Sequence, residues 1–157
     1  MKRIVLYVLI LVLTLMVPVN RLDVAKLRPV EVIYIYKMND RVVIQTDTED
    51  MGVGKDAAQA LTDMRETSPA VIYLDTAEFL LVGENAKEEA EHLRTELKDN
   101  VRLCEVLGTV DLQLAAKYLT VHGDLPTFRL WNKDTRLPRI YTENERIKMS
   151  KKDEKTS

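Results

Sequence analysis

Two glycines beside an acidic loop are the first residues in this chain whose spacing is typical of ligand binding. Residues 52–54 (Gly-Val-Gly) precede a predicted helix, as in loops that bind phosphate through backbone N–H groups. The other fingerprint residues are absent, and Asp47, Glu49 and Asp50 would repel a phosphate. Asp47, Glu49 and Gly52 also match three positions of a calcium loop, but Ala58 stands where that loop needs a bidentate Glu. We therefore interpret the glycines as residues that bend a loop into a helix.

The remaining side chains with reactive chemistry stand alone in the sequence. Glu89 and His92 make one Glu-x-x-His pair on a predicted helix, whereas a di-iron site needs two such pairs. Asp75 follows a predicted buried strand, a common place for function in α/β domains, but no base or nucleophile accompanies it. Cys104 lies in an apolar stretch, so we expect a buried and unreactive thiol. These residues predict no enzyme, no metal site and no cofactor.

The charge of the chain argues against one class of partner. The 157 residues include 23 Lys and Arg and 25 Asp and Glu, which gives a net charge of −2. Nucleic-acid-binding domains usually carry a basic surface, and here the basic residues of the tail are interleaved with acidic ones. We therefore expect no nucleic-acid partner.

The amino-terminal segment is almost entirely apolar. Lys2 and Arg3 precede an apolar run at residues 4–19, which as a helix is about 24 Å long, slightly short of a membrane's hydrocarbon core. We predict that residues 1–21 form an uncleaved transmembrane anchor, because the small residues of a cleavage site are missing. A cleaved signal peptide and a buried core helix are the alternatives. Basic residues flank the run on both sides, so the flanking charge does not set its orientation. Because signal-like starts usually remain in the cytoplasm, we expect the domain to lie outside the cytoplasm.

The chain after this segment divides by composition. Residues 22–29 are predicted to be a linker, residues 30–131 one globular domain, and residues 132–157 a charged, disordered tail. Apolar patterns within the domain predict strands at 30–37, 41–46, 70–74, 79–82, 101–107 and 127–131. They predict helices at 55–67, from 85 to about 97, and at 111–121.

Three details of this prediction concern turns, caps and burial. Asn39 and Asp40 are expected to join the first two strands in a hairpin, and Thr109 is expected to cap the last helix. The run at 70–74 is apolar throughout, which predicts a central strand buried on both faces. The predicted fold class is an N-terminal transmembrane helix followed by one small layered α/β or α+β domain with a mixed sheet and about three helices.

Residues 47–119 resemble a known family. An acidic loop with glycines leads to a helix that ends at Ser68-Pro69, and the segment 79–84 (FLLVGE) is similar to the family's apolar-apolar-Ile-Gly-Glu signature. A further helix and the segment 99–103 (DNVRL) follow. This pattern is similar to the N-terminal domain of the Ger(x)C family, the lipoprotein subunit of spore germinant receptors. The chain lacks that family's lipid-anchor cysteine and its two further domains. The resemblance implies a truncated relative with a non-enzymatic scaffold or interaction role.

Together these observations predict a membrane-anchored, non-catalytic, extracytoplasmic interaction or assembly module, and the resemblance implies a link to spore formation or germination. The expected location is the cell membrane, with a single pass, and the expected partners are the membrane, through residues 4–19, and a protein, such as an integral membrane protein. Tyr34 and Tyr36, which share one strand face, are candidate contacts, together with Asp47, Asp50 and Asp75. The alternatives are a cytoplasm-facing regulatory domain on a reversed anchor and a small-ligand-binding domain.

Overall fold

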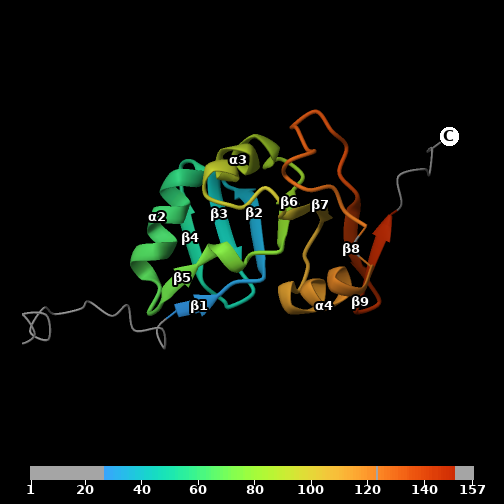
Figure 1. Ribbon diagram of the computed structural model, residues 1–157, viewed down its shortest axis with the longest axis horizontal. Helices are drawn as coiled ribbons and strands as arrows, with labels where there is room; N and C mark the ends of the chain where they lie inside the picture. The colour runs from blue at the N-terminus through green and yellow to red at the C-terminus, as the bar shows by residue number, and fades with distance from the viewer. Residues whose placement is uncertain (1–26, 123, 151–157) are drawn as a thin grey trace, which may run out of the picture.

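The computed structural model describes residues 27–122 and 124–150, which form a sheet with helices packed on it (Figure 1). The main sheet has seven strands in the order β4-β3-β2-β6-β7-β8-β9. Four neighbouring strands, β2, β6, β7 and β8, are parallel, and antiparallel strands complete both ends. The strands are β2 (Val32–Met38), β3 (Arg41–Thr46), β4 (Met51–Gly54), β6 (Phe79–Gly83), β7 (Arg102–Leu107), β8 (Arg139–Glu143) and β9 (Arg146–Ser150).

Two tight turns fix the register at the two ends of the sheet. Asn39 and Asp40 have φ values of 50° and 59°, and Asn144 and Glu145 have the same pair of values. Positive φ at both central residues is the type I′ geometry, whose twist matches that of paired strands. The hairpin predicted at Asn39-Asp40 is therefore confirmed without a glycine, because Asn and Asp tolerate the left-handed region.

Three α-helices lie in the described part of the chain: α2 (Ala57–Thr67), α3 (Lys87–His92) and α4 (Leu112–His122). The Asp56 side chain accepts a hydrogen bond from the Gln59 N–H at 2.8 Å and caps α2. Asp111 accepts from the Leu114 N–H at 2.9 Å, so Asp111, and not Thr109, caps α4. No side chain caps α3, which is also much shorter than the predicted helix and passes at once into a 3-10 turn, Leu93–Thr95.

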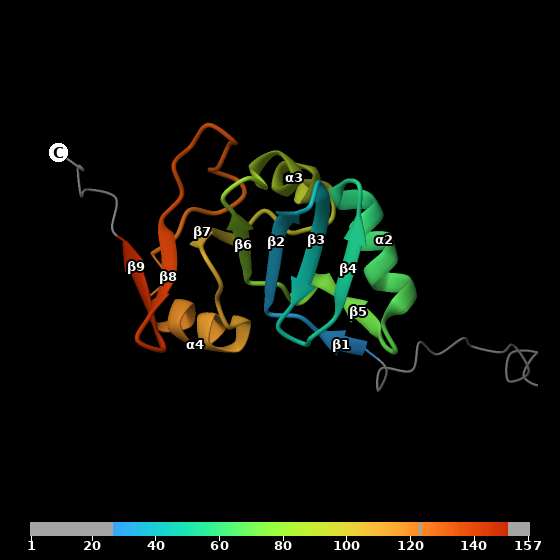
Figure 2. The ribbon, with the colours of Figure 1, turned by 180° about the vertical axis from the view of Figure 1, so that it is seen from behind.

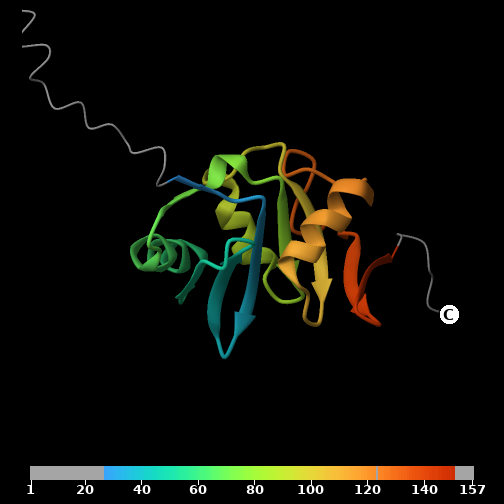
Figure 3. The ribbon, with the colours of Figure 1, turned by 90° about the horizontal axis from the view of Figure 1, so that it is seen from below.

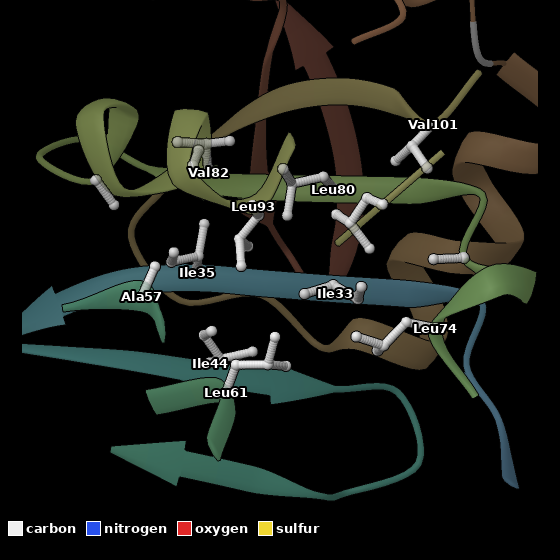
Figure 4. Close-up of a cluster of buried hydrophobic side chains, with 14 of the residues drawn as sticks. Ile33, Ile35, Ile44, Ala57, Leu61, Leu74, Leu80, Val82, Leu93 and Val101 are labelled. Carbon is white, nitrogen blue, oxygen red and sulfur yellow. The ribbon is translucent and has the colours of Figure 1, made fainter. Parts of the chain in front are cut away.

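The sheet buries apolar side chains on both faces. On one face, α2, α3 and the segment from Phe128 to Leu137 cover Ile33, Ile44 and Leu80, which form the first core (Figure 4). On the other face, α4 covers Phe79, Leu81, Cys104 and Ile140, which form the second core. Because β6 lies between the two cores, all five of its residues are buried.

The glycines of β4 allow α2 to pack directly on the strand. A Cβ atom on Gly52 would lie 2.5 Å from the Met64 backbone nitrogen and would also collide with the Ala60 oxygen. A Cβ atom on Gly54 would lie 2.7 Å from the Gln59 carbonyl carbon. The prediction of a bent loop at residues 52–54 is therefore wrong, because these residues form a strand in close contact with a helix.

Two strand predictions are also corrected. The apolar run at 70–74 gives only β5 (Val71–Tyr73), which lies outside the main sheet and pairs in parallel with β1 (Leu27–Pro29). Val71 and Tyr73 are exposed, so the central strand buried on both faces is β6. The predicted strand at 127–131 is reduced to one isolated bridge between Thr127 and Arg102, followed by a turn.

The two ends of the predicted domain change as well. Residues 27–29, predicted to be part of a linker, form β1. The tail predicted to be disordered contributes β8 and β9, because Ile140 and Ile147 reach the second core from otherwise polar strands. Residues 151–157 lie outside the described residues.

The predicted fold class is corrected in its first element. No helix within residues 27–122 and 124–150 has the length and apolar character needed to cross a membrane. The transmembrane helix predicted at residues 1–21 lies outside the described residues. What the structure shows is a small α+β domain with a mixed sheet and, in its described part, three α-helices.

Candidate interaction surface

Within the part of the chain that the structure describes, half of one sheet face carries no helix. The helix α4 covers the second face over β6, β7, β8 and β9, whereas α2 and α3 pack on the opposite side. The strands β3 and β4 and the carboxyl end of β2 are therefore open on this side, whereas α4 contacts the start of β2. No helix stands in front of β3 and β4 in Figure 2. Seen from below, α4 lies across β7, and the tip of the β2–β3 hairpin extends beyond it (Figure 3). We call this region the open sheet face and define it by Tyr34, Tyr36, Met38, Met51 and Val53.

Two stacked tyrosines form the centre of the open sheet face. The rings of Tyr34 and Tyr36 are 4.7 Å apart between centroids, at an angle of 26°. Both side chains are half-buried, and Tyr34 also packs against the second core. Burial, with smaller contributions from the neighbouring Tyr36 and Glu84, raises the pKa of Tyr34. The phenol therefore stays neutral at physiological pH, and the pair presents an aromatic surface with polar hydroxyl tips.

Gly83 makes room for this pair. It lies beside Tyr36 in the sheet, and a Cβ atom on Gly83 would lie 2.8 Å from the Tyr36 Cβ. A larger residue at this position would displace Tyr36 and separate the two rings. The glycine that the sequence shows only as the end of a strand therefore helps to shape the surface.

Two exposed methionines lie on the same side of the sheet as the tyrosines, Met38 along β2 and Met51 on the edge strand β4. Met38 at the end of β2 is 53% exposed, and Met51 at the start of β4 is 52% exposed. Val53 of β4 is partly buried on the same side of the sheet. The neighbouring strand β3 also contributes Gln45, which lies opposite Met51. Arg41 faces the same side and is exposed, so the rim carries positive charge. An apolar centre with polar groups at its margin is the arrangement found in protein–protein interfaces.

Asp50, another candidate contact, is buried in a network of hydrogen bonds. Its side chain is 4% exposed and accepts hydrogen bonds from Ser68 and Thr48, both at 2.8 Å, while Arg28 lies at 3.3 Å. Burial alone raises the pKa of this carboxyl, but these hydrogen bonds and the Arg28 guanidinium outweigh it and lower the pKa below its ordinary value. Asp50 therefore joins β1, the β3–β4 loop and the end of α2.

Asp47 and Asp75 lie at separate places. Asp47 accepts backbone hydrogen bonds from Glu31 and Val32 at 3.2 and 3.3 Å and lines an open pocket of about 280 Å³. The other lining residues are Pro29, Glu31, Gln113, Ala116 and Lys117. Asp75 is exposed on a 3-10 turn, where its backbone oxygen accepts from Lys98 at 2.7 Å. The structure does not bring the two carboxylates into one pocket.

Glu105 is a charged site that the sequence analysis missed. It is 3% exposed on β7, between Arg139 of β8, at 2.8 Å, and Lys87 of α3, at 3.5 Å. The signal was one acidic residue inside an otherwise apolar strand, Arg102–Leu107. A buried carboxylate with two cations from different elements holds β8 against the rest of the sheet, and its chemistry is structural.

The carboxylate of Glu89, from the Glu-x-x-His pair with His92, bonds to groups outside its own helix. Glu89 accepts from the Ala57 N–H at 3.1 Å and pairs with Lys37 at 3.3 Å, so its carboxylate joins two elements. Within residues 27–122 and 124–150, no three His, Cys, Asp or Glu side chains come close enough together to hold a metal ion.

Comparison with known proteins adds no relative. No protein-family model matches the chain, and neither a curated protein nor a solved structure matches it. The structure itself shows a small α+β domain whose mixed sheet is covered by a helix on only half of one face. The resemblance to the Ger(x)C family, the location at the cell membrane and the link to spores stay predictions from the sequence.

Proposed function

We propose that this domain is a non-catalytic interaction module that binds another protein through the open sheet face. The observation that carries the proposal is the group of aromatic and apolar side chains on this uncovered side, the Tyr34–Tyr36 stack together with the exposed Met38 of β2 and Met51 of β4. A sheet face of this kind is normally covered by a helix or a second sheet. Here half of the face has a helix, and the other half presents aromatic and methionine side chains.

The chemistry of the surface indicates the kind of partner. Tyrosine and methionine are enriched in interfaces because they bury a large area at low entropic cost and adapt to the opposing surface. The exposed Arg41, opposite Met38 on this side, gives the margin a positive charge. We infer a partner protein with an apolar patch, such as one face of an amphipathic helix, bordered by acidic residues.

Site-specific cross-linking in cells of the source organism tests this function. A photoreactive phenylalanine analogue replaces Met51 in the open sheet face, and in a control chain it replaces Glu66, which is exposed on the opposite side, on α2. We expect the Met51 probe to yield one discrete cross-linked protein that the Glu66 probe does not.

A variant chain supplies the second control. Tyr36→Ser together with Met38→Ser removes apolar contact area from the surface and leaves both cores intact. In this chain the Met51 cross-link should fall at least fivefold. The proposal fails if Met51 and Glu66 give the same products, if the double variant cross-links as well as the parent, or if the product joins two copies of this chain.

A further inference from the structure

The two outer edges of the main sheet differ in how their backbone groups are used. Two outward N–H groups at the β4 edge are bonded to side chains of α2: Val53 donates to Asp63 at 2.8 Å, and Lys55 just beyond the strand donates to Gln59 at 2.9 Å. An edge strand treated in this way cannot pair with a further strand without losing these bonds. The β4 edge is therefore closed at Val53 and Lys55.

At the other end of the sheet, β9 has a free edge. The two-residue turn makes Glu143 and Arg146 a hydrogen-bonded pair, so the alternation of an antiparallel ladder also directs the backbone of Lys148 and Ser150 toward β8. The N–H and C=O groups of Ile147 and Met149 then point outward. Among the described residues, none donates a hydrogen bond to these four groups or accepts one from them.

The side chains next to this edge have a definite pattern. Arg146 and Lys148 are exposed and lie on one face of β9. Lys148 pairs with Glu143, whereas Arg146 has no acidic partner among the described side chains. On the other face, Ile147 and Met149 pack against the second core, next to α4. A strand added here would meet cations on one face and an apolar surface on the other.

We propose that β9 binds an extended acidic segment of a partner protein as an eighth strand of the sheet. Acidic residues of that segment lie opposite Arg146 and Lys148, and the apolar residues that alternate with them lie beside Ile147 and Met149. The backbone supplies the affinity through the four outward groups, and the alternating side chains supply the selectivity. This site is separate from the open sheet face and does not rest on the function proposed for it.

Charge disfavours a second copy of this chain as the added strand. In an antiparallel pair of two β9 strands, the outward groups of Ile147 bond to either Ile147 or Met149 of the other copy. The first register places Arg146 opposite Lys148, and the second places Lys148 opposite Lys148. Like charges directly opposite each other destabilise a strand pair. Lysines on the edge strands of natural sheets oppose edge-to-edge pairing for the same reason.

The test uses two substitutions at one position of the full chain. Met149→Pro removes an N–H that points away from β8, so the ladder with β8 keeps its bonds, while Met149→Ala loses the same side chain and keeps the N–H. The probe is a fluorescein-labelled eight-residue peptide that alternates Glu and Val, compared with a peptide that alternates Lys and Val. Fluorescence anisotropy measures the binding.

We expect the Glu peptide to bind and the Lys peptide not to bind. Met149→Pro should weaken the binding at least tenfold and Met149→Ala less than threefold, and Lys148→Glu should weaken it at least tenfold. Equal binding by Met149→Pro and Met149→Ala contradicts strand addition, and equal binding of the two peptides contradicts the charge selection.

Hydrogen exchange on the unsubstituted chain covers the case in which Met149→Pro does not fold. The Glu peptide should slow exchange of the Ile147 and Met149 amides at least fivefold and leave the Lys148 amide, already bonded to β8, unchanged. Protection of the β4 amides instead, or no protection at millimolar peptide, overturns the proposal.

Discussion

The contact between β4 and α2 makes Gly52→Ala the most informative single substitution in this domain. The added Cβ would lie 2.5 Å from the Met64 nitrogen and 2.6 Å from the Met64 Cβ, where ordinary contacts exceed about 3.4 Å. The obstructing atoms belong to the helix backbone, so a side-chain rotation cannot relieve them. The whole of α2 must therefore move away from the strand by about 1 Å, which weakens the packing of its buried residues, Ala57, Ala60, Leu61 and Met64.

Overpacking of this kind costs about 1–3 kcal/mol, and occasionally more. Because the clash involves backbone, we expect Gly52→Ala to lower the free energy of unfolding by about 3 kcal/mol, although alanine is otherwise preferred to glycine in a strand. For a domain of this size the corresponding fall in Tm is about 10–15 °C. Urea unfolding followed by circular dichroism measures the free energy, and thermal unfolding measures Tm.

Gly108→Ala is the matched control. Gly108 has a φ of +76° and nothing lies within 4 Å of its added Cβ, so this substitution introduces backbone strain without a clash. Strain of this kind costs about 1–2 kcal/mol. A loss for Gly52→Ala no larger than that for Gly108→Ala would refute the conclusion that α2 is in close contact with β4.

Three further predictions concern buried polar groups. Because the pKa of Asp50 is lowered in the folded state, its contribution to stability is complete above about pH 4 and is lost as the pH falls through the folded-state pKa. Stability measured against pH should therefore fall in acid, and Asp50→Asn should reduce this fall. An unchanged fall in the variant would assign it to other groups. Glu105→Gln should destabilise the domain by about 1.5–3 kcal/mol and speed amide exchange in β8, whereas Glu143→Gln, in an exposed pair with Lys148, should have no measurable effect on either. Burial strongly raises the pKa of the Cys104 thiol, so a thiol reagent should label it only on unfolding; rapid labelling of the native protein would contradict its burial.

The elements that the sequence predicts well are those with a clear period and a local stop signal. Residues Ala57, Ala60, Leu61 and Met64 repeat at helical spacing, and α2 buries these four. Tyr34 and Tyr36 are two residues apart in a strand, which places them on one face, and the structure stacks their rings. Both inferences need only local geometry.

The errors arise where long-range packing decides. The runs at 70–74 and 79–83 are equally apolar, and only the pairing of β6 between β2 and β7 makes the second run central. The β8–β9 hairpin contributes one buried residue from each strand, Ile140 and Ile147, which is too weak a pattern to distinguish from a polar tail. The burial of Asp50 depends on Arg28 and Ser68, each about 20 positions away in the chain.

The segment between α4 and β8 contains the residue that dominates the intrinsic fluorescence of the protein. Trp131 is the single tryptophan of the chain, and it is buried with its ring centroid 5.8 Å from that of Phe128. Arg94 donates to the backbone oxygens of both residues, at 2.6 and 2.7 Å, which ties this segment to α3's side of the first core. Tryptophan fluorescence therefore reports on the environment of Trp131 alone. A change in this emission without a change in the helical circular dichroism marks the release of this segment while α2 is still folded.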